Sequence, residues 1–392
     1  MAHIITIGTG KNRKYKVMYE LPPVMGERKR KSKTFPVGTP KSVVDEFKRQ
    51  VEINLATGEF TSDKNITLAD YVEKVYFDTY TKYLSPTTVT NYKRLYTSNK
   101  SYCIKNYFGK YKMKDISRRM VQQYVNTLSD NVSSKTVREY IFWLNSVFNA
   151  AISEDIIKPE NNPAVHMKLP PKTKAPIEAY TVDEVNKLLT LSKNDDINHI
   201  VIGLGCLAGL RRGEMLGLRW KDVDLNGENP VIHIVQTRVV AGGIEYIKPP
   251  KTKAGKRDIP VPKALVQILK NAELQYKANK LKGGKDFIDS GYVITKSNGE
   301  AYRPDGVSIH YERFMYKVKE EHNIPYKSLH KLRHSYATLL IDGGANPKVV
   351  QKNLGHEDIS MTLGTYAHAY SERQRNEVDK LDAVIVSSSE VS

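Results

Sequence analysis

Apolar residues recur every three or four positions over most of the chain, whereas strict alternation of apolar and polar residues is confined to short stretches. The first pattern predicts amphipathic helices and the second predicts half-buried strands. In residues 134–154, for example, Val137, Ile141, Leu144 and Phe148 fall on one helical face. We expect helices at about 67–83, 86–99, 117–128, 134–154, 263–280, 304–322, 328–342 and 347–354, and strands at 231–235, 244–247 and 257–261. The predicted fold class is mainly α with small antiparallel sheets (α+β).

A basic segment with strand periodicity lies near the N-terminus. Residues 11–33 hold nine Lys or Arg against two acids, and their alternation predicts a short β-meander. Thr39 and Pro40 have the residue types of a helix N-cap and a first helical position. The helix that follows presents Val44, Phe47, Val51 and Leu55 on one face and is expected to end at Gly58. Such a ββ(β)α unit suits insertion of its strands into a DNA groove, although a solvated basic hairpin without a ligand has the same pattern.

Shifts in composition divide the chain into four segments. We expect the β-rich unit at 1–62, a helical domain at 66–157, a proline-rich basic linker at 158–176 and a mixed, mainly α domain with a C-terminal tail at 177–392. Thr181, with Glu184 three residues later, forms a capping box. Other helix start signals are Thr67, Ser85, Ser117 and Ser134. These signals predict a multidomain chain.

The charge balance points to a polyanionic partner. The 392 residues carry 61 Lys and Arg against 43 Asp and Glu, a formal net charge of +18. Neutralisation of phosphates by such cations drives sequence-independent binding to nucleic acid. The two cysteines, Cys103 and Cys206, form no disulfide framework, so we expect the protein to work in a reducing cytosol. No stretch approaches the length of a membrane span, and we expect no membrane association.

Three short motifs carry the candidate chemistry. One is His330-Lys331-Leu332-Arg333, and another is Leu354-Gly355-His356, followed ten residues later by Tyr366. The third is Gly209-Leu210-Arg211-Arg212-Gly213-Glu214, and Lys251 lies between it and the first. Two arginines can grip phosphate oxygens, histidines can transfer protons and a tyrosine hydroxyl can attack. This set suits cleavage of a phosphodiester without a metal.

The arrangement resembles the tyrosine recombinases, in particular the integrases of phages and integrative elements. The resemblance implies an arm-type DNA-binding domain at 1–62, a helical core-binding (SAM-like) domain at 66–157 and a catalytic domain at 177–392. It also implies a 3′-phosphotyrosyl intermediate that conserves bond energy, so that no cofactor is needed. The expected catalytic residues are Arg211, Lys251, His330, Arg333, His356 and Tyr366, with Tyr366 as the nucleophile and Lys251 as the donor to the 5′ leaving oxygen.

Several of these assignments have rivals within the same motifs. Tyr370, four residues after Tyr366, could share its helical face. Lys253 and Lys256 compete with Lys251 on what we expect to be a basic β-turn between strands. His330 and His334 have the spacing of a zinc-binding pair, but the zinc-hydrolase signature needs Glu where this chain has Lys331. The zinc interpretation is therefore disfavoured.

The expected partner is double-stranded DNA with core-type and arm-type sites, bound by a homotetramer with an accessory DNA-bending or excision factor. Two other functions fit the same residues: a non-catalytic sequence-specific DNA-binding protein, and a type IB topoisomerase-like enzyme. Candidate DNA contacts outside the catalytic set are all basic: Lys14, Lys16, Arg28, Arg30, Lys33, Lys93, Arg94, Lys135, Arg138, Lys172, Lys174, Arg212 and Lys253. The sequence therefore predicts a DNA recombinase that integrates and excises a mobile element or prophage.

Overall fold

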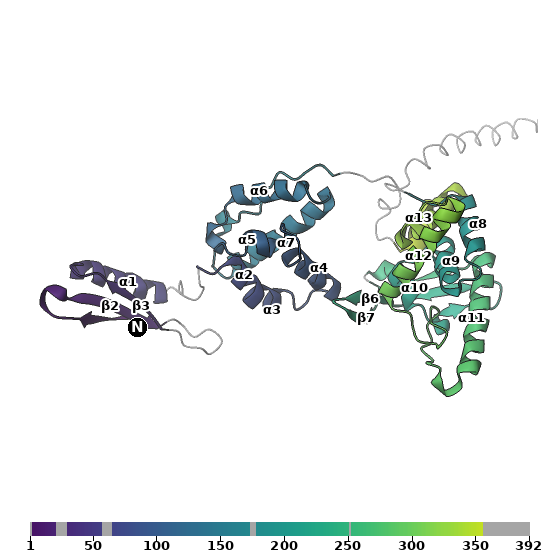
Figure 1. The fold of residues 1–392 in the computed structure, drawn as a ribbon, viewed down its shortest axis with the longest axis horizontal. Coiled ribbons are helices and arrows are strands. Elements are labelled where there is room, and N and C mark those ends of the chain that lie inside the picture. Colours follow the sequence, from purple (N-terminus) through teal and green to yellow (C-terminus); the bar gives the residue numbers. More distant parts are fainter. Residues whose placement is uncertain (1, 21–29, 57–64, 173–177, 251, 356–392) are drawn as a thin grey trace, which may run out of the picture. The chain divides into compact units, whose positions relative to one another are not determined.

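The computed structural model describes residues 2–20, 30–56, 65–172, 178–250 and 252–355. The chain forms two compact units, Met1–Lys174 and Ala175–Ser392, which are described separately here (Figure 1). Helices dominate and the sheets are small and antiparallel, which confirms the predicted fold class. Short 3-10 turns also occur: η1 (Gly10–Asn12), η3 (Met113–Asp115), η4 (Pro159–Asn161), η5 (Trp220–Asp222), η6 (Lys253–Gly255) and η7 (Gly284–Asp286).

The N-terminal residues form a three-stranded antiparallel sheet with one helix on its back. The strands β1 (Ala2–Ile7), β2 (Lys14–Glu20) and β3 (Arg30–Phe35) lie in the order β1-β2-β3, and α1 (Lys41–Ala56) follows. Val17, Val44 and Val51 lie at the centre of the small core between sheet and helix. The prediction did not include β1, because its apolar residues do not alternate cleanly with polar ones.

The start of α1 differs from the prediction in detail. The hydroxyl of Thr39 donates to the carbonyl oxygen of Pro36 at 2.8 Å, and the helix begins at Lys41, one residue after the predicted first helical residue Pro40. The predicted stop at Gly58 lies outside the described residues.

A helical bundle follows in the same unit. Its elements are α2 (Leu68–Tyr71), a π-helical turn η2 (Val72–Tyr76), α3 (Phe77–Tyr80), α4 (Pro86–Tyr96), α5 (Ile104–Phe108), α6 (Arg118–Ser129) and α7 (Ser134–Ser153). The side chains of Thr67, Ser85 and Ser117 accept the expected capping hydrogen bonds. The last helix is capped by Ser133, one residue before the predicted start signal. Helix α5 was not predicted, because five residues are too few to establish a helical period.

Much of the predicted linker is packed on this bundle. Ala164 is buried in the bundle core, and Met167 and Leu169 pack against it. Gln122 exchanges two hydrogen bonds with the backbone of Lys168, at 3.1 and 3.0 Å. The described part of the proline-rich segment is therefore held along the bundle surface as far as Pro170, whose carbonyl accepts from Arg138 at 2.8 Å.

The second unit is a mainly helical domain with two small sheets. Its helices are α8 (Val182–Leu191), α9 (Asp196–Ala208), α10 (Arg212–Gly217), α11 (Lys263–Gly283), α12 (Pro304–His322), α13 (Leu329–Asp342) and α14 (Pro347–Leu354). Its strands are β4 (Val223–Asp224), β5 (Val231–Ile234), β6 (Thr237–Ala241), β7 (Ile244–Lys248) and β8 (Arg257–Pro260). The capping box of Thr181 and Glu184 starts α8 as predicted.

The strand pairing separates β7 from β8. β7 pairs with β6, whereas β8 pairs with β5 in the sheet β4-β5-β8. Lys251, predicted on a β-turn between strands, lies outside the described residues, and the strands on either side of it do not pair with each other. The segment that follows β7 crosses from one sheet to the other and includes the turn η6.

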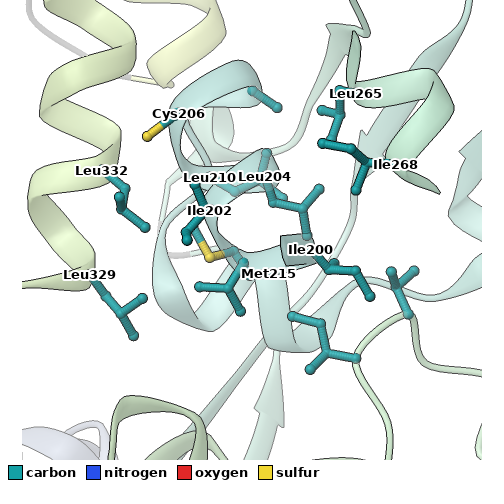
Figure 2. Close-up of a cluster of buried hydrophobic side chains, with 14 of the residues drawn as sticks. Ile200, Ile202, Leu204, Cys206, Leu210, Met215, Leu265, Ile268, Leu329 and Leu332 are labelled. Atoms are coloured by element: carbon teal, nitrogen blue, oxygen red, sulfur yellow. The ribbon is translucent and has the colours of Figure 1, made fainter. Parts of the chain in front are cut away.

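Helix α9 forms the centre of the core of this domain. Its buried residues contact α11 through Leu265 and Ile268, and α13 through Leu329 and Leu332 (Figure 2). A β-carbon on Gly205 would lie 2.6 Å from the β-carbon of Leu332, so glycine at this position allows α13 to lie directly against α9. This close approach fixes the helix that carries His330 and Arg333.

Candidate active site

The first predicted arginine lies where α9 turns into α10. Gly209 ends α9 in the left-handed conformation (φ 64°), which only glycine adopts without strain. Arg211 is the N-cap residue of α10, and its backbone N–H donates to Oε2 of Glu214 at 2.9 Å. Its guanidinium also donates to Oε1 of Glu214 at 2.8 Å. Arg211 stays partly exposed, with 38% of its side chain accessible, so its remaining N–H groups can reach a ligand.

The second arginine comes from α13. Arg333 is only 3% exposed and donates to the carbonyl oxygen of Gly209 at 2.7 Å and to that of Leu354. Its Nη1 lies 3.9 Å from Oε2 of Glu214. The structure therefore brings Arg211 and Arg333, which are far apart in the sequence, to the same carboxylate.

A third arginine, which the sequence analysis did not assign to the site, completes this cluster. Arg257 at the start of β8 makes a forked ion pair with Glu214, with both N–O distances 3.0 Å. Its Nε donates to the carbonyl oxygen of Asn353 at 2.6 Å. The sequence signal that could have identified Arg257 is the alternation along the strand. Arg257 lies on the same buried face as Ile259, and Asp258 between them lies on the exposed face.

The balance of charge in this cluster is positive. Burial raises the pKa of Glu214, but the hydrogen bonds from Arg257 and the charges of Arg257 and Arg211 outweigh it and hold the pKa below its ordinary value. Glu214 is therefore a carboxylate that faces three guanidinium groups. The excess positive charge suits an anionic ligand such as a phosphodiester.

His330 lies one helical turn before Arg333. The residue is solvent-exposed, yet crowding of its ring by neighbouring atoms, together with the charges of Arg333, Arg211 and Lys331, lowers its pKa. The His334 ring lies edge-on to it at 4.9 Å between centroids, and burial with nearby cations lowers the pKa of His334 to about 4. Both imidazoles are therefore neutral at pH 7, and His330 can donate or accept one hydrogen bond at each nitrogen.

The predicted residues Lys251, His356 and Tyr366, and the rival Tyr370, lie outside the described residues. Gly355, immediately before His356, caps α14 in the left-handed conformation (φ 60°), and its carbonyl oxygen accepts from Arg211 at 3.3 Å. A β-carbon on Gly355 would lie 2.7 Å from the carbonyl oxygen of Ala254. The end of α14 and the turn η6 therefore meet beside the two arginines.

The predicted arm-domain cations lie on two faces of the sheet. By strand register, Lys14, Lys16 and Arg30 share the face opposite α1. Lys33 is on the helix side, where its ammonium lies 4.3 Å from the centroid of the Phe47 ring. The open face therefore holds the first three and not Lys33. Arg28 lies outside the described residues.

The candidate DNA-contacting residues of the helical bundle lie on α4 and α7, and an ion pair joins these two helices. Arg94 on α4 lies 4.0 Å from Glu139 on α7, and Lys93 and Lys135 are exposed on the same two helices. Arg138 is half-buried and donates to the carbonyl oxygens of Ser134 and Pro170, so its guanidinium holds protein backbone.

Four other candidates lie in the predicted linker or in the catalytic domain. Lys172 is exposed, and Lys174 lies outside the described residues. Arg212 is exposed and donates to the hydroxyl of Ser308 at 3.0 Å. Lys253 begins the turn η6, and only its backbone is described.

The described residues contain neither a metal-binding cluster nor a membrane-spanning helix. Across these ranges, three or more His, Cys, Asp or Glu side chains do not gather as they would to hold a metal ion. Nor does any helix within them combine the length and apolarity needed to cross a bilayer.

The site and fold agree with comparisons to known proteins. The phage integrase family model matches residues 178–373, and the model of the N-terminal SAM-like domain of phage integrases matches residues 67–129. The chain is 27% identical to a tyrosine recombinase XerC-like protein of Caldanaerobacter subterraneus subsp. tengcongensis, over 87% of this chain and 89% of that protein. It is 26% identical to the ICEBs1 integrase of Bacillus subtilis, over 94% of this chain and 96% of that protein.

A solved structure gives the same result. Residues 82–397 of the Tn1549 transposon integrase, in complex with a circular intermediate DNA, superpose with a TM-score of 0.63 at 26% identity, covering 81% of this chain and 99% of that one. The chain belongs to the phage integrase family. It is a tyrosine recombinase, an enzyme that cuts and rejoins DNA.

Proposed function

We propose that this recombinase integrates and excises a mobile element by attack of Tyr366 on a DNA phosphate. The attack forms a 3′-phosphotyrosyl bond and releases a 5′-hydroxyl, and a 5′-hydroxyl of a partner duplex then displaces the tyrosine. The observation that carries the proposal is the convergence of Arg211 and Arg333 on Glu214 and on the end of α14. If these groups formed only an ion-pair network on the protein surface, Arg333 and Glu214 would be exposed. They are instead buried, at 3% and 2% exposure.

The two arginines act on the charge that develops at the phosphorus. The Arg211 side chain stays partly exposed, and Arg333 is immobilised by two backbone carbonyls. Preorganised donors of this kind stabilise a transition state without reorganisation. We assign them to the non-bridging oxygens, and we expect loss of either to slow cleavage by roughly 10²–10³-fold.

The remaining roles concern protons. A free tyrosine has a pKa of about 10 and is almost wholly protonated at pH 7, so Tyr366 requires neighbouring cations or a base. His330 is neutral at pH 7 and is exposed one turn from Arg333, which supports a role in hydrogen bonding or proton transfer, together with His356. We assign protonation of the 5′ leaving oxygen to Lys251.

We assign the DNA partners by unit. The N-terminal sheet, residues 1–62, binds arm-type sites through the face that carries Lys14, Lys16 and Arg30. The helical domain at 66–157 and the catalytic domain at 177–392, joined by 158–176, bind core-type sites. Exchange between two duplexes requires four strand cleavages, so the working form is a homotetramer, which an accessory DNA-bending or excision factor assists in the bacterial cytoplasm.

The test is covalent trapping on DNA from the source of the protein. Sheared DNA is incubated with the protein, the reaction is quenched with detergent, and protein-linked fragments are sequenced, with Tyr366→Phe and Tyr370→Phe in parallel. Links at a few discrete sites, lost in Tyr366→Phe and kept in Tyr370→Phe, support the proposal. Links scattered over arbitrary sequence would favour a topoisomerase-like activity. Specific binding without links, also on nicked substrates that trap short-lived intermediates, would favour a DNA-binding protein without catalysis.

A further inference from the structure

Arg257 occupies a position where four pieces of the catalytic domain meet. Its guanidinium bonds to Glu214 on α10, to the carbonyl oxygen of Asn353 at the end of α14, and at 3.1 Å to the carbonyl oxygen of Gly255 in η6. Asn353 and Glu214 are 96 and 43 residues from it in sequence. Its side chain is 4% exposed, and four of its five N–H groups are engaged by these protein partners, so we assign it no DNA phosphate.

We propose that Arg257 is a positioning residue for the cleavage reaction. It keeps Glu214 as a carboxylate that is shared between Arg257 and Arg211, so that Arg211 remains available to the phosphate. It also fixes the end of α14 against η6. This inference rests on the proposed function, because it concerns the same phosphate site. It assigns a role to a residue that neither touches the substrate nor reacts.

Arg257 and Arg211 share the carboxylate of Glu214. Each carboxylate oxygen of Glu214 accepts from Arg257 at 3.0 Å, and Oε1 also accepts from Arg211 at 2.8 Å. Without Arg257, one buried carboxylate would depend on Arg211 as its main cationic partner. The ion pair between them would then retain the guanidinium that the phosphate requires.

The planar shape of the Arg257 guanidinium also matters. A planar guanidinium has five N–H donors in a fixed fork, whereas an ammonium is a point charge. Arg257 uses this fork for three backbone or carboxylate partners at once. Lysine at this position would keep the charge but could not span Glu214, Asn353 and Gly255 together. The conservative substitution is therefore informative.

The experiment compares Arg257→Lys and Arg257→Met with a matched control, Arg238→Met. The Arg238 side chain is buried to a similar degree, at 3% exposed. It pairs with Glu245 at 2.6 Å and donates to the carbonyl oxygen of Leu216, but it does not contact Glu214 in any described interaction. The full-length proteins are assayed by single-turnover cleavage of a nicked duplex that carries the core-type sequence recovered by trapping. Melting temperature and affinity for the same duplex are measured alongside.

We expect both Arg257 variants to bind the duplex with wild-type affinity at a temperature well below melting, and to cleave it about 10- to 100-fold more slowly, by analogy with outer-shell partners elsewhere. Arg238→Met should melt earlier but cleave at the wild-type rate. Equal rates for wild type and both Arg257 variants would overturn the inference. An equal loss of rate in Arg238→Met would also overturn it, because the loss of any buried arginine would then be enough to slow cleavage.

A pH profile separates positioning from general loosening. Described charges that face Glu214 come from α10 (Arg211), β8 (Arg257) and α13 (Arg333). In Arg257→Met the pKa of Glu214 should rise, because its main hydrogen-bond donor is removed. Protonation of Glu214 should then free Arg211, so acidification should narrow the difference in cleavage rate between Arg257→Met and wild type. Superimposable normalised profiles would refute the role through Glu214. Absence of cleavage by wild-type protein would instead refute the proposed function.

Discussion

Replacing Gly205 by alanine tests whether the contact between α9 and α13 positions the active site. A β-carbon at Gly205 would lie 2.6 Å from Cβ and 2.9 Å from Cδ1 of Leu332, the residue before Arg333. Carbon atoms pack at about 3.5–4.0 Å, so α13 must move away by about 1 Å. Gly203→Ala is the matched control on the same helix, because its β-carbon would meet only the terminal methyl groups of Ile268 and Leu265, at 3.1 and 3.2 Å.

The two substitutions should differ in both stability and rate. Each gains about 0.5–1 kcal/mol from replacing a glycine within a helix. Gly205→Ala additionally overpacks the core, which costs about 1–3 kcal/mol or more, whereas rotation of side-chain ends can relieve Gly203→Ala. We expect the unfolding free energy to fall by about 1–2 kcal/mol for Gly205→Ala and to stay within about 1 kcal/mol of wild type for Gly203→Ala. A shift of about 1 Å at Arg333 should slow cleavage by about 10²-fold.

Urea unfolding and single-turnover cleavage, each on the full-length chain, measure these quantities. A change of midpoint at constant slope reports stability. Gly205→Ala with wild-type stability and a wild-type cleavage rate would refute the claim that this close approach places Arg333. Equal losses in both variants would show that any added methyl group in α9 is harmful.

Three further predictions concern separate parts of the chain. Thr181→Ala removes the capping box of α8 and should lower the unfolding free energy by about 1 kcal/mol without changing the cleavage rate, as chemical denaturation and the trapping assay will show. His334 has a pKa lowered to about 4, so below about pH 6.5 the unfolded chain binds a proton more readily than the folded chain does. The free energy of unfolding should therefore fall as pH drops from about 6.5 towards 4. His334→Asn should make that fall shallower in urea titrations. Lys16→Met should weaken arm-site binding and reduce the salt slope of log affinity by about 0.9, whereas Lys33→Met, on the helix side of the sheet, should leave both unchanged in salt-dependent binding assays.

Helix positions were predictable because their signals are local. Capping side chains such as Thr67 and Ser117 lie within three residues of the backbone groups that they satisfy, so the sequence predicts where the helices begin. Strand pairing was not predictable in the same way. The alternation of 244–247 and 257–261 predicted two strands, but not that one pairs with β6 and the other with β5.

The candidate site shows the same division. Arg211, His330 and Arg333 could be predicted from motifs, and the structure places both arginines at Glu214. Arg257 could not, because its role is defined by partners 43 and 96 residues away. Likewise, the prolines and lysines of 158–170 predicted a linker, whereas packing against Gln122 and Arg138 depends on the folded bundle.

The most direct test of the account is identification of the amino acid that becomes linked to DNA. The trapped complex is digested with nuclease and trypsin, and the peptide that carries a residual nucleotide is fragmented in a mass spectrometer. The account predicts a nucleotide attached through its 3′ phosphate to the hydroxyl of Tyr366. A link to Tyr370, to any other side chain, or through a 5′ phosphate would contradict it.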